Sequence, residues 1–457
     1  MTVEPIEVTT PRQIAAKFLG GFVPAVAYHF GVLEILQERG FVLRSGFRRP
    51  DEPRQTGPPG FDLVVGSSAG AFFVVAACAG ATRDDLVGAI ETGEARFDPF
   101  DAKLLGEGDG LVRKTLDWAQ QGPRPSWRNR RTWKAWAAES TLNTLFPLWK
   151  LDSIGRYLGQ GILGGRSWRD LRSEAAILAV DLNHPVTLIT GERESPVLQL
   201  FRDEPVGAEA IHRILGSEGH KIVDEFATAG VPRDHPVLAP LVAQPWRRLT
   251  SVSIRGVPMA TAAAGSMATF PFYAPVRFVD ESGKPYRLGH YRVVVEDGED
   301  RNPFTTDVAE EAGADLVIIS SISAPYKYLH GLGSLSERGY GDMHYQKSAH
   351  SRDSKQENVV RMHRDFRRLY ETAHELLERS ECMPEALDEL RAAFHEVARI
   401  DNTRVRITPD PDVAAENHIL RTLDPLEFSP QAVHRAFTLG HMVAKRVLKR
   451  YRFEFLD

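Results

Sequence analysis

The stretch from residue 61 to residue 78 constrains the fold of this chain most strongly. A short β-branched run, Phe61-Asp-Leu-Val-Val, leads directly into Gly66-Ser-Ser-Ala-Gly, and a small apolar helical segment follows. A G-x-S-x-G sequence in a sharp strand-to-helix turn holds its central residue in a strained conformation, and only small neighbours leave room for the backbone. The pattern therefore predicts a nucleophile elbow in which Gly66 and Gly70 flank an outward-facing Ser68. Because the chain has 37 glycines, a turn that serves packing alone is the alternative.

The rest of the chain shows the same alternation of strands and helices. Strands are expected where short apolar runs occur, and helices where apolar residues recur with the helical period. An entirely apolar run such as Leu316-Val-Ile-Ile is typical of a strand covered on both faces in a parallel sheet. We therefore expect an α/β fold, a three-layer α/β/α sandwich with a mostly parallel central sheet and helical insertions. Besides the strand before the elbow, strands are predicted at 175–182, 186–190, 291–295, 316–319 and 404–407.

The expected organisation is one large domain with insertions. At 457 residues the chain is longer than an ordinary single domain. A tryptophan-rich stretch and a polar, proline-containing stretch interrupt the alternation. We expect an N-terminal extension at 1–14, a catalytic domain at 15–321 with helical insertions at about 100–170 and 203–248, and a mainly helical region at 322–457 whose last strand and helix (403–449) complete the same domain.

Composition excludes several classes of function. The chain has 56 Lys and Arg against 61 Asp and Glu, a net charge of −5, whereas a dedicated nucleic-acid-binding protein carries a basic surplus. Two cysteines form neither a disulfide framework nor a four-ligand zinc site, and Cys78 is expected to be buried. We therefore expect no nucleic-acid partner, no metal and no cofactor.

The first residues and the longest apolar run indicate where in the cell the protein is located. The first residues lack the basic and apolar regions of a secretory signal. The longest apolar or small run, residues 69–81, has 13 residues, and a membrane-spanning helix needs roughly 20. A cytoplasmic protein is expected, with or without peripheral membrane contact.

A nucleophilic serine needs a base, and two kinds of side chain compete for that role. None of the 15 histidines stands in a loop directly after a clear strand, where a Ser-His-Asp arrangement would place it. Asp297 follows the predicted strand at 291–295, at the sheet edge that carries functional groups in α/β proteins, and a carboxylate can act alone as general base. A simple Asp297-Gly298 turn fits the position equally well. Beyond the loop 296–301, Asn302 and Pro303 predict a helix start with Asn302 as its N-cap.

The order of these motifs resembles the patatin-like phospholipases. The resemblance covers about residues 15–321, and the last strand and helix are similar to the family's ending. Chance agreement over so many ordered segments is improbable. The matching segments are Gly20-Gly21 before Tyr28-His-Phe-Gly-Val-Leu, the elbow, Asp181-Leu-Asn, Gly265-Ser266-Met-Ala, Asp297-Gly298, Asn302 and Gly313-Ala-Asp-Leu-Val-Ile.

The resemblance implies a Ser-Asp catalytic dyad without histidine. Ser68 would be the nucleophile, and Asp297, on the dyad loop with Gly298, would be the base. The substrate class would be lipid acyl esters, so the implied activity is that of a lipid acyl hydrolase (a phospholipase A or carboxylic ester hydrolase) in which water releases the acyl-enzyme. The oxyanion hole would consist of backbone amides of Gly20, Gly21 and Phe22.

Two departures from the family pattern keep other functions open. The loop Gly20-Gly-Phe-Val-Pro lacks the family's third glycine and its basic residue, and Pro24 has no N–H to donate. Glu299 stands where the family has a second glycine after the aspartate. Since loss of one oxyanion donor can cost about 10²–10³ in rate, one alternative is a catalytically impaired pseudoenzyme or lipid-binding regulator. The other is a conventional α/β-hydrolase with a histidine base that the sequence does not reveal.

Residues 124–136 suggest a contact with membranes. Arginines and a lysine alternate there with tryptophans, a combination that suits the lipid headgroup boundary. The alternative, which we favour slightly, is a solvated helical insertion whose tryptophans pack on the sheet or cover an acyl pocket. The expected partners are thus a lipid or acyl-ester substrate and a membrane surface touched through this segment. The sequence indicates no oligomeric state.

Overall fold

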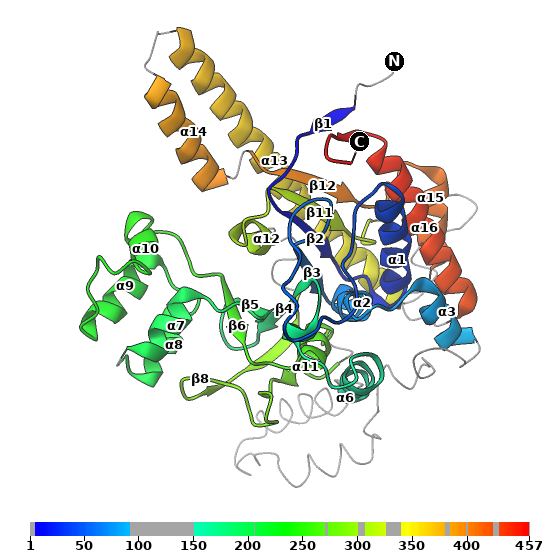
Figure 1. Cartoon of the computed structure of the whole chain (residues 1–457), viewed down its shortest axis with the longest axis horizontal. Helices are drawn as coiled ribbons and strands as arrows, with labels where there is room; N and C mark the ends of the chain where they lie inside the picture. The colour runs from blue at the N-terminus through cyan, green and yellow to red at the C-terminus, as the bar shows by residue number, and fades with distance from the viewer. Residues whose placement is uncertain are drawn as a thin grey trace, which may run out of the picture. The chain divides into compact units, whose positions relative to one another are not determined.

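The structure is a mixed α/β protein with a mostly parallel central sheet and many helices, which confirms the predicted fold class at that level (Figure 1). The computed structural model describes residues 5–91, 150–204, 206–269, 273–299, 307–325, 340–379, 384–398, 401–423 and 429–456. Its internal contacts divide the chain into two compact units. The N/C unit comprises Met1–Arg44, Pro53–Val65 and Pro303–Asp457, and the middle unit comprises Ser45–Glu52 and Gly66–Asn302.

The strands of the N/C unit include the order β12-β11-β2-β3, in which β11 pairs in parallel with both of its neighbours. All residues of β2 and β11 are buried, as expected for strands covered on both faces. The strands predicted at 316–319 and 404–407 are confirmed. The strands of this unit are β1 (Ile6–Val8), β2 (Ile14–Phe18), β3 (Leu63–Ser67, from which the chain continues into the middle unit), β11 (Leu316–Ser320), β12 (Thr403–Ile407) and β13 (Tyr451–Phe453).

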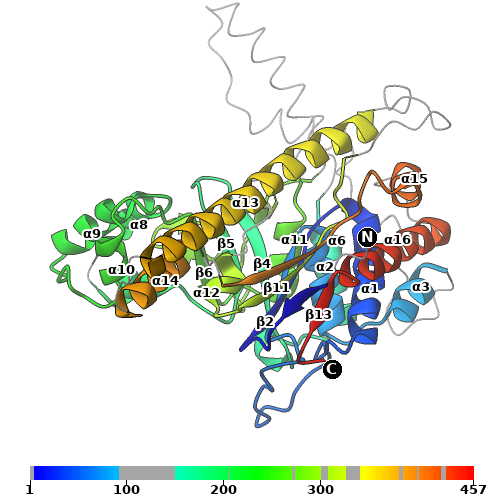
Figure 2. The same ribbon diagram turned by 90° about the horizontal axis from the view of Figure 1, so that it is seen from above.

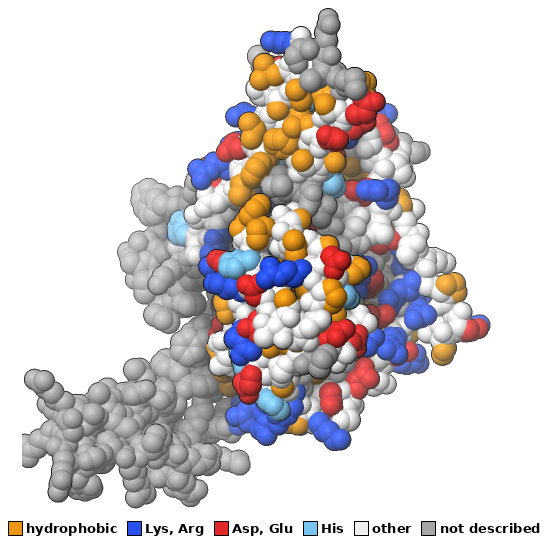
Figure 3. Space-filling model, turned by 90° about the vertical axis from the view of Figure 1, so that its left-hand side faces the viewer, with side chains coloured by type: hydrophobic (Ala, Val, Ile, Leu, Met, Phe, Trp, Pro, Cys, Tyr) orange, Lys and Arg blue, Asp and Glu red, His pale blue; other side chains and the backbone are white. Residues whose placement is uncertain are grey.

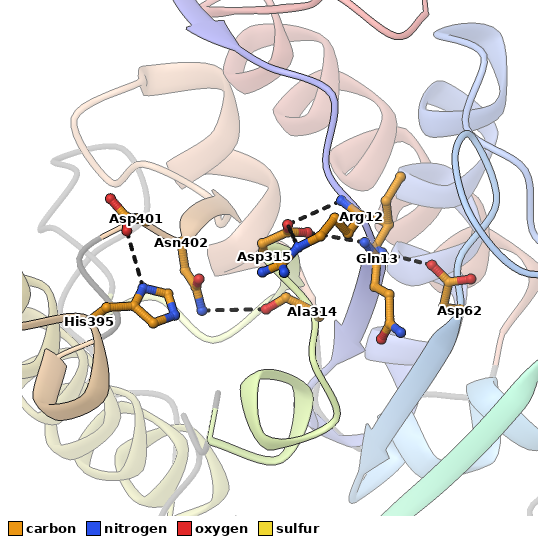
Figure 4. Close-up of polar contacts among 9 residues, drawn as sticks. Arg12, Gln13, Asp62, Ala314, Asp315, His395, Asp401 and Asn402 are labelled. Carbon is orange, nitrogen blue, oxygen red and sulfur yellow. Dashed lines mark hydrogen bonds and ion pairs between the residues drawn. The ribbon is translucent and has the colours of Figure 1, made fainter. Parts of the chain in front are cut away.

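Carboxylates that precede the strands tie the strand starts together. Asp62, just before β3, accepts a hydrogen bond from the backbone N–H of Ile14 at the start of β2, at 2.9 Å. Asp315, just before β11, accepts from the backbone N–H groups of Arg12 and Gln13, both at 3.1 Å. Figure 4 shows these contacts side by side. The strand register is therefore fixed by side chains as well as by the sheet's own hydrogen bonds.

Two long helices of the N/C unit pack through glycines. A Cβ added at Gly31 would lie 2.3 Å from the carbonyl oxygen of Phe437, and one added at Gly440 would lie 2.1 Å from that of Tyr28. Only glycine permits this approach, which Figure 2 shows as α1 and α16 side by side. The helices of this unit are α1 (Phe22–Glu38), α12 (Asp307–Glu311), α13 (Tyr340–Arg379), α14 (Pro384–Ala398), α15 (Ala414–Thr422) and α16 (Pro430–Leu448).

In the middle unit, β4 pairs antiparallel with both β5 and β10, and β5 pairs in parallel with β6. β4 and β5 confirm the strands predicted at 175–182 and 186–190. The strands are β4 (Glu174–Asp181), β5 (Thr187–Gly191), β6 (Ser251–Arg255), β7 (Val276–Arg277), β8 (Arg287–Leu288), β9 (Tyr291–Arg292) and β10 (Val294–Asp297). The helices are α2 (Ala69–Cys78), α3 (Arg83–Glu91), α6 (Asp152–Arg156), η2 (Tyr157–Ile162), η3 (Trp168–Asp170), α7 (Pro196–Asp203), η4 (Ala208–Ala210), α8 (Ile211–Ile214), α9 (Gly219–Thr228), α10 (Ala239–Ala243) and α11 (Met259–Ser266).

The structure differs from the sequence predictions at two places. The strand predicted at 291–295 is present but divided into β9 and β10, and pairing with β4 extends β10 two residues into the predicted loop 296–301, to Asp297, opposite Ala179. Residues 6–8, expected within an extension, form β1 and pair in parallel with β13, a strand that was not predicted. Both differences come from pairing between segments distant in sequence.

Some expectations fall outside the described residues. These are most of the insertion expected at 100–170, with the cluster 124–136, and the helix start at Asn302. Cys78 is fully buried, as expected. Within the described ranges, no helix is both long enough and apolar enough to cross a bilayer.

A buried histidine holds the chain between β2 and α1. The Nε2 of His29 lies 2.5 Å from the carbonyl oxygen of Leu19, which only accepts, so Nε2 carries the proton. Nδ1 then accepts from the hydroxyl of Ser320 at 2.8 Å. Burial lowers the pKa of His29 to about 3, although the hydrogen bond to Leu19 acts in the opposite direction. His29 is therefore a neutral residue that orients the start of the Gly20-Gly21 loop.

Acid is expected to destabilise the protein through His29. Because its pKa is about 3 in the folded state and 6.5 for a histidine exposed to water, only the unfolded state binds the proton between these values. The free energy of unfolding should fall as the pH drops below 6.5, by about 1.4 kcal/mol per pH unit from this group. Urea unfolding at pH 7.5 and pH 5.5 measures this loss.

Two variants isolate this contribution. His29→Gln keeps one donor and one acceptor and should remove about 1.4 kcal/mol of the loss between the two pH values. His220→Gln, at a side chain that is 50% exposed, should leave the loss unchanged. Equal acid sensitivity of the wild type and His29→Gln would contradict the prediction.

Candidate active site

Ser68 occupies a strained turn between β3 and α2. Its φ of 53° and ψ of −130° make it the only non-glycine residue with positive φ in the described part of the chain. Such a sparsely populated conformation costs a non-glycine residue about 1–3 kcal/mol. A Cβ added at Gly66 would lie 2.7 Å from the Cα of Ala71 and from the carbonyl oxygen of Gly70. The turn thus has the geometry of a nucleophile elbow.

The hydroxyl of Ser68 donates a hydrogen bond to a carboxylate. Its Oγ lies 2.7 Å from Oδ2 of Asp297, although 229 residues separate the two in sequence. Asp297 is the last residue of β10 and is fully buried, and Ser68 is 8% exposed. The structure therefore brings together the two residues that the sequence singled out as nucleophile and base.

Further donors hold the Asp297 carboxylate in place. The hydroxyl of Thr269 donates to the same Oδ2 that receives the Ser68 proton. The backbone N–H of Glu299 donates to Oδ1 at 2.9 Å, and the N–H of Asp297 itself donates to the carbonyl of Ala268 at 3.2 Å. Thr269 was not predicted from the sequence, because a threonine shortly after a helix carries no distinctive pattern.

Ser266, the last residue of α11, connects the elbow to the dyad loop. Its Oγ accepts from the backbone N–H of Ser68 at 2.8 Å and donates to the carbonyl of Leu178 in β4 at 2.5 Å. Its own carbonyl accepts from the N–H of Gly298 at 3.2 Å. The family resemblance includes Ser266 as part of a segment, but only the structure reveals this connecting role.

Two glutamates lie near the Asp297 carboxylate. Glu299 is 3% exposed, and its Oε1 accepts from the hydroxyl of Ser67 at 3.0 Å. Glu299 thus binds the residue that precedes Ser68. Burial and the neighbouring charge of Asp297 raise the pKa of Glu296. The site therefore contains two buried carboxylates, Asp297 and Glu299, with the half-buried Glu296 beside them.

A histidine-aspartate pair does occur in the middle unit, but its histidine contacts a second histidine and not Ser68. The Nδ1 of His184 lies 3.1 Å from Oδ1 of Asp181, which also accepts from the hydroxyl of Tyr291 at 3.1 Å. The Nε2 of His184 lies 2.8 Å from Nδ1 of His212. The nitrogen that a triad histidine would direct at the serine is therefore used elsewhere, and the hydroxyl of Ser68 is directed at Asp297.

The residues expected to form the oxyanion hole belong to the N/C unit. Gly21 precedes α1 with a φ of 148°, and a Cβ there would lie 2.1 Å from Cγ2 of Ile322, so the position requires glycine. The carbonyl of Gly20 accepts from the hydroxyl of Ser323 at 3.4 Å. Phe22 is the first residue of α1. Their role as oxyanion donors stays a prediction.

No metal site is apparent in the described residues, where no three His, Cys, Asp or Glu side chains are grouped as metal ligands are. The chemistry that the site itself offers is proton transfer from a serine hydroxyl to a buried carboxylate. A helix also begins at Ala69, directly after the serine, and helix N-termini favour negative charge.

Gly298→Ala should distort the dyad loop. A Cβ at this position would lie 2.1 Å from the carbonyl oxygen of Leu178, so the loop or β4 must shift, at a cost of about 1–3 kcal/mol of stability. Denaturant unfolding measures the loss. Gly207→Ala is the control, because nothing lies within 4 Å of a Cβ there, and its stability should stay within about 0.5 kcal/mol of wild type. Equal stabilities of the two variants would argue against the loop geometry.

The chain was also compared with known proteins. No protein-family model matches it, and no curated protein matches it. Any statement about its function therefore depends on the geometry of the site and on the motifs in the sequence.

Proposed function

We propose that this protein is a patatin-like lipid acyl hydrolase that uses Ser68 as nucleophile and Asp297 as general base. The observation that carries the proposal is the 2.7 Å hydrogen bond from the Ser68 hydroxyl to the Asp297 carboxylate, at a strained strand-to-helix turn. A strained serine aimed at a buried base is costly to maintain, and such strain concentrates at functional sites. We further propose that the enzyme is cytoplasmic and that it hydrolyses acyl esters at a lipid surface.

The reaction follows from the positions of these groups. Asp297 accepts the hydroxyl proton while Ser68 Oγ attacks the ester carbonyl carbon; this carbon becomes tetrahedral, and its carbonyl oxygen becomes the oxyanion. The backbone amide that follows a nucleophile elbow, here that of Ala69, donates to such an oxyanion, and the Gly20-Gly21 loop would supply the second donor. The oxyanion then collapses, the ester C–O bond breaks, and Asp297 returns its proton to the leaving alcohol.

The second half of the reaction repeats these steps with water. Asp297 accepts a proton from a water molecule whose oxygen attacks the acyl carbon of the Ser68 ester. The tetrahedral intermediate breaks the bond to Oγ, the proton returns to Ser68, and the carboxylic acid leaves. Thr269 and the Glu299 amide keep the carboxylate oriented during both halves.

Labelling with a fluorophosphonate ester tests the dyad without knowledge of the natural substrate. The purified chain should form an adduct on Ser68, located by mass spectrometry, with and without dilute detergent. Asp297→Asn should slow labelling and ester hydrolysis by about 10²–10⁴-fold, because the serine loses its base. Ser68→Ala should abolish the adduct.

Two neighbouring variants are the controls. Glu296→Gln changes the adjacent carboxylate, and His184→Gln changes the histidine that faces Asp181, so both should label at the wild-type rate. Loss of labelling in His184→Gln would instead support a histidine-based α/β-hydrolase. A Ser68 adduct without turnover of any acyl ester would support the lipid-binding pseudoenzyme, and a folded chain with no adduct at Ser68 would refute the hydrolase.

A further inference from the structure

A surface segment without charged residues includes α10. Residues 236–246 read Pro-Val-Leu-Ala-Pro-Leu-Val-Ala-Gln-Pro-Trp and contain no Lys, Arg, Asp, Glu or His, whereas 26% of the residues in the whole chain are charged. Leu238 and Leu241 are buried, and α10 contacts α9. The exposed apolar residues that this packing leaves on the surface are Pro236, Ala239, Pro240, Val242, Ala243 and Trp246. We call these six residues the α10 patch.

Trp246 and Val242 are the large side chains of the patch. Trp246 is 73% exposed, and Val242 is 49% exposed. Trp246 follows Pro245 in a turn that the N–H of Arg247 closes by donating to the carbonyl of Gln244 at 2.9 Å. A tryptophan left in water forgoes the favourable free energy that burial of so large a ring provides. A surface that covers the α10 patch would gain this free energy.

Hydrogen bonds hold the end of the patch against the start of α9. The N–H of Gly219 donates to the carbonyl of Arg247 at 2.8 Å, and the N–H of His220 donates to the carbonyl of Pro245 at 3.1 Å. A Cβ at Gly219 would lie 2.9 Å from the carbonyl oxygen of Leu241, so this close approach requires glycine. Because the backbone is held on both sides of the tryptophan, docking of the ring orders little additional chain.

Positive charge is in excess at the Trp246 end of the patch. The amine of Lys221 and the guanidinium of Arg248 lie 3.6 and 3.2 Å from the carboxylate of Glu218. The hydrogen bond from Arg248 and the charge of Lys221 lower the pKa of Glu218. Two cations thus share one carboxylate, which leaves a net positive charge beside the tryptophan. Figure 3 faces the side on which Figure 1 draws α9 and α10, and it shows hydrophobic and basic side chains next to one another.

The other end of the patch has no such excess. Arg233 pairs with Asp224 at 2.7 Å, and the neighbouring Asp234 is exposed. An anionic surface would therefore attract the Trp246 end of the patch more strongly than the end at Pro236.

We propose that the α10 patch docks this chain on an anionic lipid surface, with Trp246 at the level of the lipid headgroups. Apolar side chains with an aromatic ring and cations at their edge are typical of segments that lie in a membrane interface. A protein partner would need about one hydrogen bond per 100–200 Å² of interface, and the six side chains of the patch offer only the indole N–H. The choice of lipid also rests on the proposed function, whose substrate is a lipid ester.

Cosedimentation with vesicles of phosphatidylcholine and phosphatidylglycerol tests the docking. The parent is the full chain with Ser68→Ala, so that hydrolysis does not alter the vesicles, and it should bind them. Trp246→Ala and Val242→Glu should each weaken binding by about tenfold or more, since one removes apolar surface and the other brings a charge into the lipid. Val360→Glu is the matched control, because Val360 is 51% exposed but lies in α13. Vesicles of phosphatidylcholine alone should bind the parent more weakly.

A fluorescent probe tests which surface enters the lipid. In a Cys382→Ser background, Ala243→Cys is labelled with a polarity-sensitive dye, and Cys78 is fully buried and so protected from the dye. Addition of the anionic vesicles should shift the emission of this dye to shorter wavelength, because the dye leaves water. The same dye on Val360→Cys should keep its emission wavelength.

Several outcomes would overturn the docking. These are a parent that does not bind anionic vesicles, equal weakening by Val242→Glu and Val360→Glu, and equal emission shifts at the two labelled positions. Self-association without lipid that Val242→Glu abolishes would identify a second copy as the occupant. Circular dichroism and thermal unfolding establish that each variant is folded.

Failure of the docking is distinguishable from failure of the proposed hydrolase. A wild-type chain that hydrolyses a short water-soluble ester but does not bind vesicles would overturn the docking and retain the hydrolase. Vesicle binding through the α10 patch without hydrolysis of any ester would retain the docking and refute the hydrolase.

Discussion

The strained backbone of Ser68 is the constraint on which the arrangement of the site depends. A positive φ at a serine is unfavourable by itself, so neighbouring groups must hold it. Gly66 leaves room for the turn, α2 begins at the next residue, and the hydroxyl of Ser266 accepts the hydrogen bond of the Ser68 amide. In the turn held in this way, the hydroxyl of Ser68 donates its hydrogen bond to Asp297.

The other residues of the site donate hydrogen bonds to the polar groups that are buried around Ser68. A carboxylate without access to water is stable only when donors surround it, and those of Asp297 come from Ser68, Thr269 and the Glu299 amide. Glu299 in turn accepts from Ser67. Because these residues share hydrogen bonds, their contributions should be coupled. The hydrogen bond between Ser68 and Asp297 is therefore held in place by a connected set of polar groups around it.

Local sequence patterns predicted the individual elements well and their ends less well. The strands β4, β5 and β11 were predicted because each is a short, mostly apolar run with no competing helical period, and β12 because Val405 and Ile407 alternate with arginines. The extension of β10 to Asp297 and the pair β1–β13 were missed. Both depend on a partner strand far away in the sequence, and short polar or aromatic runs acquire strand structure only when that partner is present.

The sequence by itself determined the sharp strand-to-helix turn at Ser68, because the strand, the two glycines and the following helix are all contiguous within it. By position it also favoured Asp297 over the histidines as the base, and it left open whether Asp297-Gly298 forms only a turn. Only the tertiary structure decided that Asp297 receives the Ser68 hydroxyl, while His184 faces His212. It likewise placed Ser266 and Thr269 in the site. The physical reason is that a hydrogen bond requires two atoms within about 3 Å, and residues 229 positions apart meet only through the pairing and packing of the whole unit.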